Sequence, residues 1–355
     1  MSSNPQTLTI TQPDDWHLHL RDGDALHAVV GDSARQFKRA IIMPNLKPPV
    51  TTLEQAFSYR GRILSALQAQ GLGDLGFDPL MTLYLTDNTR VEDIEAIAAS
   101  PDVYAVKLYP AGATTNSDQG VTDLLGRCSK VLEAMQRLSV PLLVHGEVTD
   151  PAIDVFDREA VFIERVMIGL RKAFPELRVV FEHLTTKDAV DYVRQAEGPI
   201  GATITPQHLL YNRNAIFTGG LRAHWYCLPV LKRETHRLAL VEAATSDNPR
   251  FFLGTDSAPH ARALKEHASS CAGCYSALHA MTLYATVFDS VGRLDRLEAF
   301  ASHRGADFYG LPRNTAKLTL IKQPYEVPES LPFGKASLVP LASGEIFPWQ
   351  VQSLD

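Results

Sequence analysis

The chain has 355 residues, of which 45% are hydrophobic and 21% are charged, and its formal net charge is −6. This composition can build a large buried core and argues against disorder. The sequence has no long Lys/Arg run, which argues against a nucleic-acid partner. The N-terminus does not predict a signal peptide, and no apolar stretch reaches membrane-spanning length. We therefore expect a soluble, cytoplasmic protein.

Short β-type runs alternate with longer helical patterns along the chain. The eight β-type runs are 16–21, 39–44, 79–85, 103–109, 141–145, 178–183, 201–205 and 250–254. The helical patterns between them are 53–70, 91–99, 122–138, 158–174, 186–195 and 232–246. Asp123, Asp157 and Thr186 are candidate N-terminal signals for three of these helices.

Repeated strand–helix units with eight strands predict a closed parallel (β/α)8 barrel of the TIM type, because parallel neighbours need crossover connections. The alternative is an open doubly wound sheet, which usually carries a Gly-rich phosphate turn after its first strand; residues 21–24 are not such a turn. Two further helices are predicted at 276–288 and 293–302. The Pro-rich tail 311–355, with β-like pieces at 317–321 and 337–341, holds too few apolar residues for its own core. We expect one domain over 1–355, with the tail as an appendage.

The four cysteines stand at 128, 227, 271 and 274. Cys271 and Cys274 form a Cys-x-x-Cys motif, which is found in zinc ribbons and in redox pairs. A zinc ribbon needs a second pair, and a redox motif would lie near an early βαβ unit. Reduced thiols in a loop are therefore the favoured interpretation.

His17 and His19 lie one residue apart in an alternating run near the N-terminus. On a β-strand the two side chains point to the same side and can bind one metal ion, whereas on a helix they would point in different directions. Two ordinary, partly buried imidazoles near a strand end are the alternative. Metal binding is favoured because other residues that can bind a metal ion lie at the ends of other predicted strands.

The active-site residues of a (β/α)8 barrel lie at the carboxyl ends of its strands. Residues that suit this place follow or end six of the predicted strands: His17 and His19, Asn45, Lys107, His145, His183 and Asp256. Imidazole nitrogens and a carboxylate suit zinc. Each of His145 and His183 could instead bind a loop carbonyl, so only their common position favours a metal site.

Lys107 lies within an apolar strand, where a charged side chain carries a large desolvation cost unless it is paired or neutralised. A buried ion pair between Lys107 and a carboxylate such as Asp256 is one explanation. Another is reaction of the amine with CO2 to give a carbamate, an anionic oxygen donor that can bridge two zinc ions. The second explanation removes the buried cation and supplies the bridge.

Six motifs occur together in this order along the chain: PDDWHLHLRDG (13–23), MPNL (43–46), KLYP (107–110), LVHGE (143–147), FEH (181–183) and LGTDSAPH (253–260). With these motifs the chain resembles the dihydroorotases of the bacterial single-function type, within the amidohydrolase superfamily. The resemblance runs over nearly the whole chain. It implies a cyclic amide hydrolase of pyrimidine biosynthesis that interconverts L-dihydroorotate plus water and N-carbamoyl-L-aspartate.

The resemblance implies two zinc ions per subunit. His17 and His19 with Asp256 would hold the more buried ion, His145 and His183 would hold the other, and carboxylated Lys107 (N6-carboxylysine) and a hydroxide would bridge the two. The hydroxide would attack the ring amide, and Asp256 would be the general acid and base.

The resemblance also implies the substrate contacts. Arg21, Asn45 and His260 would bind the free carboxylate, and Arg suits this role because its planar fork matches a carboxylate. The backbone at Leu228 and Ala272 would contact the pyrimidine ring. The loop 111–117, through Thr114 and Thr115, would close over substrate as a lid that excludes water.

Two other functions remain open at this point. Hydantoinases and allantoinases share the metal ligands but not the carboxylate clamp, and a non-catalytic relative would have lost ligands that this chain keeps. As a partner beside the small-molecule substrate, the family implies a second copy of the chain in a homodimer.

Overall fold

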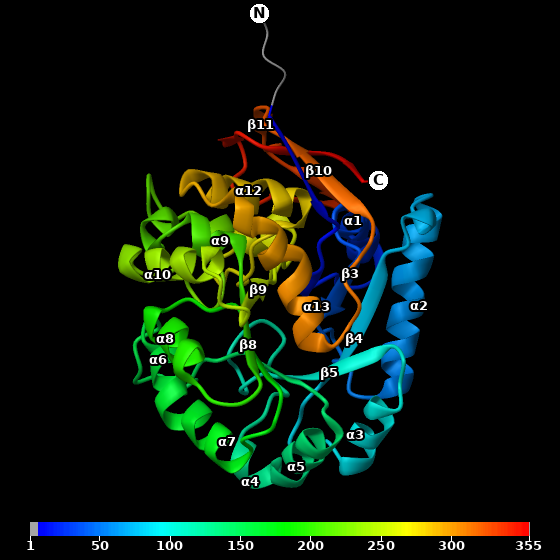
Figure 1. The fold of residues 1–355 in the computed structure, drawn as a ribbon, viewed down its shortest axis with the longest axis vertical. Coiled ribbons are helices and arrows are strands. Elements are labelled where there is room, and N and C mark those ends of the chain that lie inside the picture. Colours follow the sequence, from blue (N-terminus) through cyan, green and yellow to red (C-terminus); the bar gives the residue numbers. More distant parts are fainter. Residues whose placement is uncertain (1–5, 355) are drawn as a thin grey trace, which may run out of the picture.

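Eight parallel strands form the centre of the computed structural model, which describes residues 6–354 (Figure 1). They are β2 (Asp15–Leu18), β3 (Arg39–Ile42), β4 (Asp78–Tyr84), β5 (Val103–Leu108), β6 (Leu142–Val144), β7 (Val179–Phe181), β8 (Ile200–Ile204) and β9 (Phe251–Leu253). The strands pair in chain order, and a parallel bridge from Leu18 to Ser257 joins the last strand to the first. This closed order confirms the predicted (β/α)8 barrel and excludes the doubly wound sheet, whose strand order is not sequential.

Each of the eight predicted strands coincides with a barrel strand, and the structure moves their ends by up to three residues. The runs are apolar because a parallel sheet is covered on both faces. Strands β2, β3, β6, β7, β8 and β9 are buried along their whole length.

The barrel is surrounded by helices, which lie around its outside in Figure 1. They are α1 (Gly23–Ala34), α2 (Leu53–Ala69), α3 (Val91–Ala98), α4 (Leu124–Arg127), α5 (Ser129–Leu138), α6 (Arg158–Phe162), α7 (Ile168–Ala173), α8 (Lys187–Gln195), α9 (Pro206–Leu210), α10 (Glu234–Thr245), α11 (Arg262–Lys265), α12 (Ala280–Ser290) and α13 (Arg304–Tyr309). Short helical turns are η1 (Gly73–Leu75), η3 (Arg213–Ile216), η4 (Ala223–Trp225), η5 (Ala277–His279) and η6 (Leu294–Arg296), and two π-helical turns are η2 (Ile163–Met167) and η7 (Ala299–His303).

Several helix predictions need correction. Helix α1 was not predicted, because its buried residues give only a weak amphipathic pattern. The predicted helix 122–138 is interrupted at Cys128, and 158–174 contains the π turn η2. The predicted helix 293–302 is instead two short turns, η6 and η7, followed by α13.

Two of the three predicted helix-start signals form side-chain caps. Asp123 accepts a hydrogen bond from Gly126 N at 2.9 Å, and Thr186 accepts one from Ala189 N at 3.1 Å. Such caps satisfy backbone donors that the first helical turn leaves free. Asp157 stands at the start of α6 but its side chain makes no capping bond.

The N- and C-terminal segments meet in a second, three-stranded antiparallel sheet in the order β1 (Thr7–Thr11), β10 (Lys317–Ile321) and β15 (Gln350–Leu354). Two small ribbons complete the tail: β11 (Tyr325–Glu326) with β14 (Ile346–Phe347), and β12 (Leu331–Phe333) with β13 (Ala336–Leu338). Leu318, Leu320 and Trp349 are fully buried in the same apolar core as the barrel helices. The tail thus uses the barrel's core, in line with the single domain predicted for 1–355, which stays a prediction.

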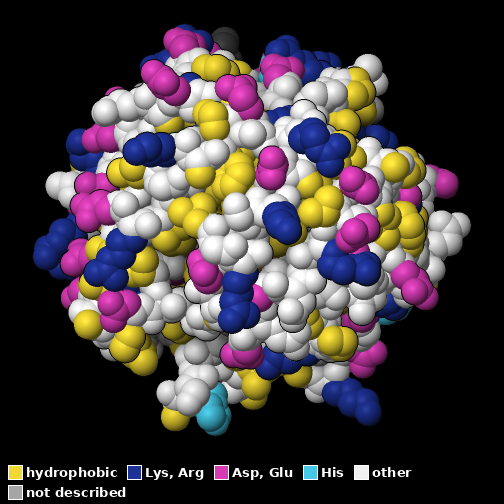
Figure 2. All heavy atoms as spheres, turned by 90° about the horizontal axis from the view of Figure 1, so that it is seen from below, with side chains coloured by type: hydrophobic (Ala, Val, Ile, Leu, Met, Phe, Trp, Pro, Cys, Tyr) yellow, Lys and Arg dark blue, Asp and Glu magenta, His cyan; other side chains and the backbone are white. Residues whose placement is uncertain are grey.

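On the face shown in Figure 2, basic and acidic side chains are interspersed and apolar side chains occur in small groups. None of the helices in residues 6–354 is both long and apolar enough to cross a membrane.

Candidate metal centre and active site

The six predicted metal-ligating side chains lie at the carboxyl ends of the barrel strands. They come from β2, β5 and the segments after β6, β7 and β9, and are His17, His19, Lys107, His145, His183 and Asp256. Each is at most 8% exposed. The closed barrel therefore brings together residues that are up to 239 positions apart (17 to 256).

His17, His19 and Asp256 form the tightest group. Nε2 of His17 lies 3.3 Å from Nε2 of His19, and Oδ1 of Asp256 lies 3.2 Å and 3.0 Å from these two nitrogens. All three side chains thus direct one ligand atom to a common point.

The seam between β2 and β9 explains this convergence. Asp256 N donates to His17 O at 2.9 Å, and His19 N donates to Ser257 O at 3.1 Å. Beneath them, the Asp15 carboxylate accepts hydrogen bonds from Thr255 N at 2.8 Å and Thr255 Oγ1 at 2.6 Å. The seam therefore fixes the register that sets the ligands opposite each other.

A second group combines His17, Glu182 and His183, whose ligand atoms also lie within 4.8 Å of one another. Oε1 of Glu182 lies 3.1 Å from Nδ1 of His17, and its Oε2 contacts Nζ of Lys107. The ring centroids of His145 and His183 are 4.7 Å apart. His145 belongs to neither group, and its Nε2 lies 2.8 Å from Oε2 of Glu147.

Burial sets the protonation of the cluster. It lowers the pKa of His17, His145 and His183, and it lowers the pKa of His19 to about 3. Burial also holds the pKa of Lys107 well below its usual value. These imidazoles are neutral at pH 7, and each therefore has a nitrogen lone pair for a metal ion.

Asp256, unlike the histidines, is charged at pH 7. Burial alone would raise the pKa of Asp256, but its contacts with His17 and His19 hold it well below the usual value. Asp256 is therefore an anion at pH 7, and it supplies negative charge beside the neutral imidazoles.

The residues fit a metal ion by two further tests. Ligands at 2.0–2.1 Å around a tetrahedral zinc lie roughly 3.4 Å apart, close to the 3.0–3.3 Å separations among His17, His19 and Asp256. Nδ1 of His183 is buried without a hydrogen-bond partner among the described residues. Buried polar atoms usually have partners, so an unpartnered imidazole nitrogen in this cluster fits a metal ligand.

The predicted carboxylate clamp lies beside the cluster. Nη2 of Arg21 is 3.0 Å from Nε2 of His260, and Oδ1 of Asn45 is 2.9 Å from Nδ1 of His19. Arg21 is half-buried, its Nε donates to Pro259 O at 3.2 Å, and no carboxylate within residues 6–354 forms an ion pair with it. Burial is the main influence that lowers the pKa of its guanidinium. A partly buried cation without an anion favours binding of an anionic ligand.

The loop with Thr114 and Thr115 covers the same cavity, which also has Leu228 and Ala272 in its wall. Thr115 Oγ1 donates to Ala272 O at 3.2 Å, and Asn45 Nδ2 donates to Thr115 O at 3.1 Å. The space left inside is only about 20 Å³. The structure therefore has the loop in a closed position.

The cysteines are free thiols, as expected. Cys227 and Cys274 are buried and Cys271 is half-buried. The Cys-x-x-Cys segment carries Ala272 and Gly273 into the cavity wall, and no cysteine of the described chain belongs to a metal-ligating group.

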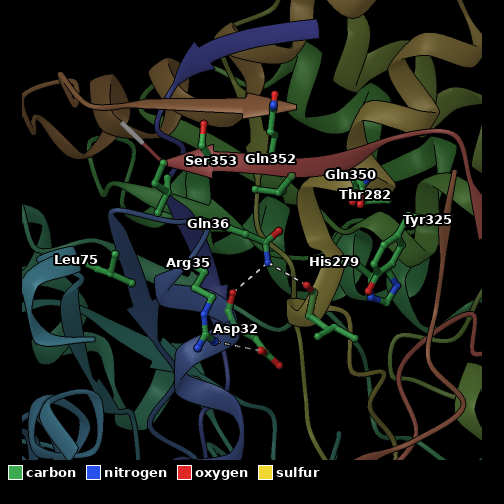
Figure 3. A pocket seen from close by; sticks show the side chains of 13 residues that line it. Asp32, Arg35, Gln36, Leu75, His279, Thr282, Tyr325, Gln350, Gln352 and Ser353 are labelled. Carbon is green, nitrogen blue, oxygen red and sulfur yellow. Dashed lines mark hydrogen bonds and ion pairs between the residues drawn. The ribbon is translucent and has the colours of Figure 1, made fainter. Parts of the chain in front are cut away.

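A wider hollow of about 560 Å³ lies apart from this cluster, between α1, η5 and β15 (Figure 3). Its polar side chains already have partners within the protein: Gln36 donates to the backbone carbonyls of Asp32 and Ala277, and Nη1 of Arg35 lies 3.8 Å from Oδ1 of Asp32. The small cavity with its converging ligand atoms is therefore the better candidate for chemistry.

Comparison with known proteins agrees with this geometry. Residues 11–324 match the amidohydrolase family. The chain is 70% identical over 347 residues to a dihydroorotase of Cupriavidus necator, an alignment that covers 98% of this chain and 99% of that protein. The chain belongs to the dihydroorotases of the amidohydrolase family.

Solved structures of dihydroorotases have the same fold. The enzyme from Campylobacter jejuni has 34% identity and a TM-score of 0.89, with 99% of both chains covered. The dihydroorotase of Saccharomyces cerevisiae, solved in complex with 5-fluoroorotic acid, has 31% identity and a TM-score of 0.86, with 98% of both chains covered. The predictions of a dihydroorotase, and of an enzyme of pyrimidine biosynthesis, are confirmed.

Sequence reasoning missed Glu182 and Glu147 as members of the cluster. In a regular strand neighbouring side chains point to opposite faces, so Glu182 should point away from His183. His183 has φ of +41°, which breaks this alternation and lets both side chains face the barrel interior. The available signal was a glutamate within two residues of each of these two histidines: Glu147 after His145, and Glu182 before His183.

Proposed function

We propose that this dihydroorotase interconverts L-dihydroorotate plus water and N-carbamoyl-L-aspartate at a site with two zinc ions. The observation that carries the proposal is the half-buried Arg21 guanidinium, which lies in the wall of the cavity beside the ligand cluster and has no carboxylate ion-pair partner among residues 6–354. A substrate with a free carboxylate supplies that anion. A hydantoin ring has no such group.

For the metals, we infer that His17, His19 and Asp256 hold the more buried zinc ion. His145 and His183 would hold the second, and carboxylated Lys107 would supply oxygen ligands to both. In forming the carbamate, the Lys107 amine bonds to the carbon of CO2 and releases one proton. The low pKa of Lys107 supports this step, because the neutral amine is the form that reacts. When bound, the zinc ions supply a nucleophile at neutral pH and polarise the ring carbonyl.

The chain's own acid and base is Asp256. In hydrolysis the ring C–N bond breaks, and the Asp256 carboxylate accepts the nucleophile's proton and gives it to the leaving nitrogen. In ring closure the same carboxylate takes the proton from the ureido nitrogen as the C–N bond forms. The position of Asp256 between His17 and His19 supports this role.

Arg21, Asn45 and His260 would orient the substrate through its carboxylate. Burial lowers the pKa of His260 to about 2, so it is neutral and offers one ring N–H. Leu228 and Ala272 would contact the ring through their backbone, and Thr114 and Thr115 would exclude water from the closed site.

We also propose, from the family alone, that the enzyme is a cytoplasmic homodimer.

The first experiment is an assay of purified, metal-supplemented protein against L-dihydroorotate and hydantoin, with the metal content of the same sample. Turnover of dihydroorotate with close to two zinc ions per chain is the expected result. Turnover of hydantoin alone would overturn the carboxylate clamp and leave the metal site standing. A sample that shows no turnover and contains no metal would support a non-catalytic relative.

The variant R21M tests the clamp itself. It should raise KM for dihydroorotate by about 10- to 150-fold, since a hydrogen bond to a charged group contributes ~1.5–3 kcal/mol. An unchanged KM would remove Arg21 from the clamp.

A further inference from the structure

Lys265, the last residue of the short helix α11, is a buried lysine that the mechanism above does not use. Its side chain is 3% exposed, and its ammonium donates to three backbone carbonyls: Tyr226 O, Cys271 O and Gly273 O, each at 2.8 Å. An ammonium has three hydrogens, so these three acceptors satisfy it completely. No carboxylate within residues 6–354 forms an ion pair with it.

The three carbonyls belong to two segments that form the cavity wall. One segment leads from Tyr226 to Leu228, and the other contains Cys271, Ala272 and Gly273. A hydrogen bond from Gly273 N to Tyr226 O at 3.0 Å also joins the segments. Lys265 therefore ties together two loops that have no strand or long helix to hold them.

The direction of these carbonyls determines where the opposite backbone groups point. In a trans peptide the C=O and the following N–H point in opposite directions. Because Cys271 O is turned toward Lys265, the N–H of Ala272 points away from it. Ala272 N donates to no acceptor within the described chain, and Ala272 O is engaged by Thr115 Oγ1 and lies 3.0 Å from Nε2 of His260.

We propose that Lys265 is a positioning residue that holds the free backbone N–H of Ala272 and the Tyr226–Leu228 segment in place for the substrate ring. This inference rests on the proposed function, which assigns Leu228 and Ala272 to ring binding. Preorganised backbone donors bind a ring amide without an ordering cost at the time of binding.

The test is K265M, which keeps the apolar stem and removes all three hydrogen bonds. We expect KM for dihydroorotate and the Kd for 5-fluoroorotic acid, measured by calorimetry on the zinc-loaded enzyme, to rise at least about 10-fold. The zinc content should be unchanged. Amide hydrogen exchange should become faster in residues 226–228 and 271–274.

Arg304 gives a matched control. It is also a buried cation that donates to three backbone carbonyls, those of Ala244, Ser246 and Phe251, at the amino end of β9 and away from the cavity. R304M should lower thermal stability as K265M does, yet leave KM, the Kd for 5-fluoroorotic acid and exchange at 226–228 and 271–274 unchanged.

The outcomes separate the two proposals. If the wild type does not turn over dihydroorotate, the proposed function fails. If the wild type is active and K265M binds 5-fluoroorotic acid within twofold of the wild type, only the role of Lys265 fails. If K265M does not fold, K265Q decides: its amide has only two N–H donors for the three carbonyls, so KM should still rise, and a wild-type KM would overturn the role.

Discussion

Nζ of Lys107 contacts Oε2 of Glu182, and both side chains are completely buried in the barrel. The other carboxylate oxygen of Glu182 lies 3.1 Å from Nδ1 of His17. Glu182 thus joins the lysine to the first metal-ligating histidine. Among residues 6–354 this contact is the only carboxylate pairing of Lys107.

Glu182→Gln should therefore destabilise the metal-free enzyme. Loss of the carboxylate leaves the buried Lys107 amine without its acceptor, which costs about 1–3 kcal/mol of stability. In the zinc-loaded enzyme Lys107 is proposed to be an anionic carbamate. There the substitution should lower the free energy of unfolding by much less. Urea denaturation of both forms measures the difference.

Asp191→Asn is the control, since it breaks the exposed ion pair of Lys187 with Asp191. It should cost less than about 1 kcal/mol in either form. Equal losses for Glu182→Gln in the metal-free and zinc-loaded enzyme would contradict a change in the charge of Lys107.

Asp256→Asn should lower kcat by about 10²–10⁴-fold, the usual contribution of a general acid–base group. Asn keeps the shape of the side chain and one oxygen ligand, so most of the zinc should remain bound. Steady-state kinetics and metal analysis on the same sample check both statements. A variant with normal kcat would exclude Asp256 as the proton carrier.

Thr115→Ala removes the hydrogen bond from the lid to Ala272 O. We expect kcat/KM to fall about 10-fold, because the closed position becomes less populated. Thr115→Ser keeps the hydroxyl and should retain most of the activity. Equal activities of the Ala and Ser variants would show that this bond does not hold the lid.

His279 predicts a pH dependence far from the metal ligands. Its ring packs against the rings of Tyr325 and Phe347, at centroid distances of 6.0 Å and 6.2 Å, and it lines the hollow in Figure 3. Burial lowers its pKa to about 4. The unfolded chain therefore takes up this proton first as the pH falls, and folding stability is lost between pH 6.5 and pH 4.

His279→Phe should remove this part of the acid sensitivity. Over this pH range the free energy of unfolding of the wild type should fall by up to roughly 3 kcal/mol more than that of the variant. Denaturation of both metal-free proteins at pH 7.5 and pH 4.5 gives the difference. If the two proteins lose the same amount, His279 does not titrate on unfolding in this range.

The strands and the ligand cluster could be predicted because both follow local rules. Apolar runs such as that ending at Val144 identify the strands, and the barrel rule then places the next residue, His145, at the carboxyl end. Burial of Lys107 was also predictable, since it lies inside an apolar run. These inferences needed no knowledge of long-range contacts.

The partners of these residues could not be predicted in the same way. Glu182 faces the cluster only because of the positive φ of His183, and the ammonium of Lys265 meets carbonyls that lie up to 39 residues away along the chain. Strand β1 is short and half-exposed, and it forms because β10 offers it an edge. Such features depend on tertiary structure.

The sheet β1-β10-β15 also has a consequence for synthesis of the chain. Thr9 pairs with Thr319, 310 residues later. At about 5–20 residues per second, a ribosome needs between about 15 and about 60 s to make the intervening chain. During that time the edge of β1 is unpaired. The β1 strands of neighbouring nascent chains on the same messenger RNA can therefore pair with each other. Expression at a lower initiation rate, which spaces the ribosomes, should therefore increase the yield of folded enzyme.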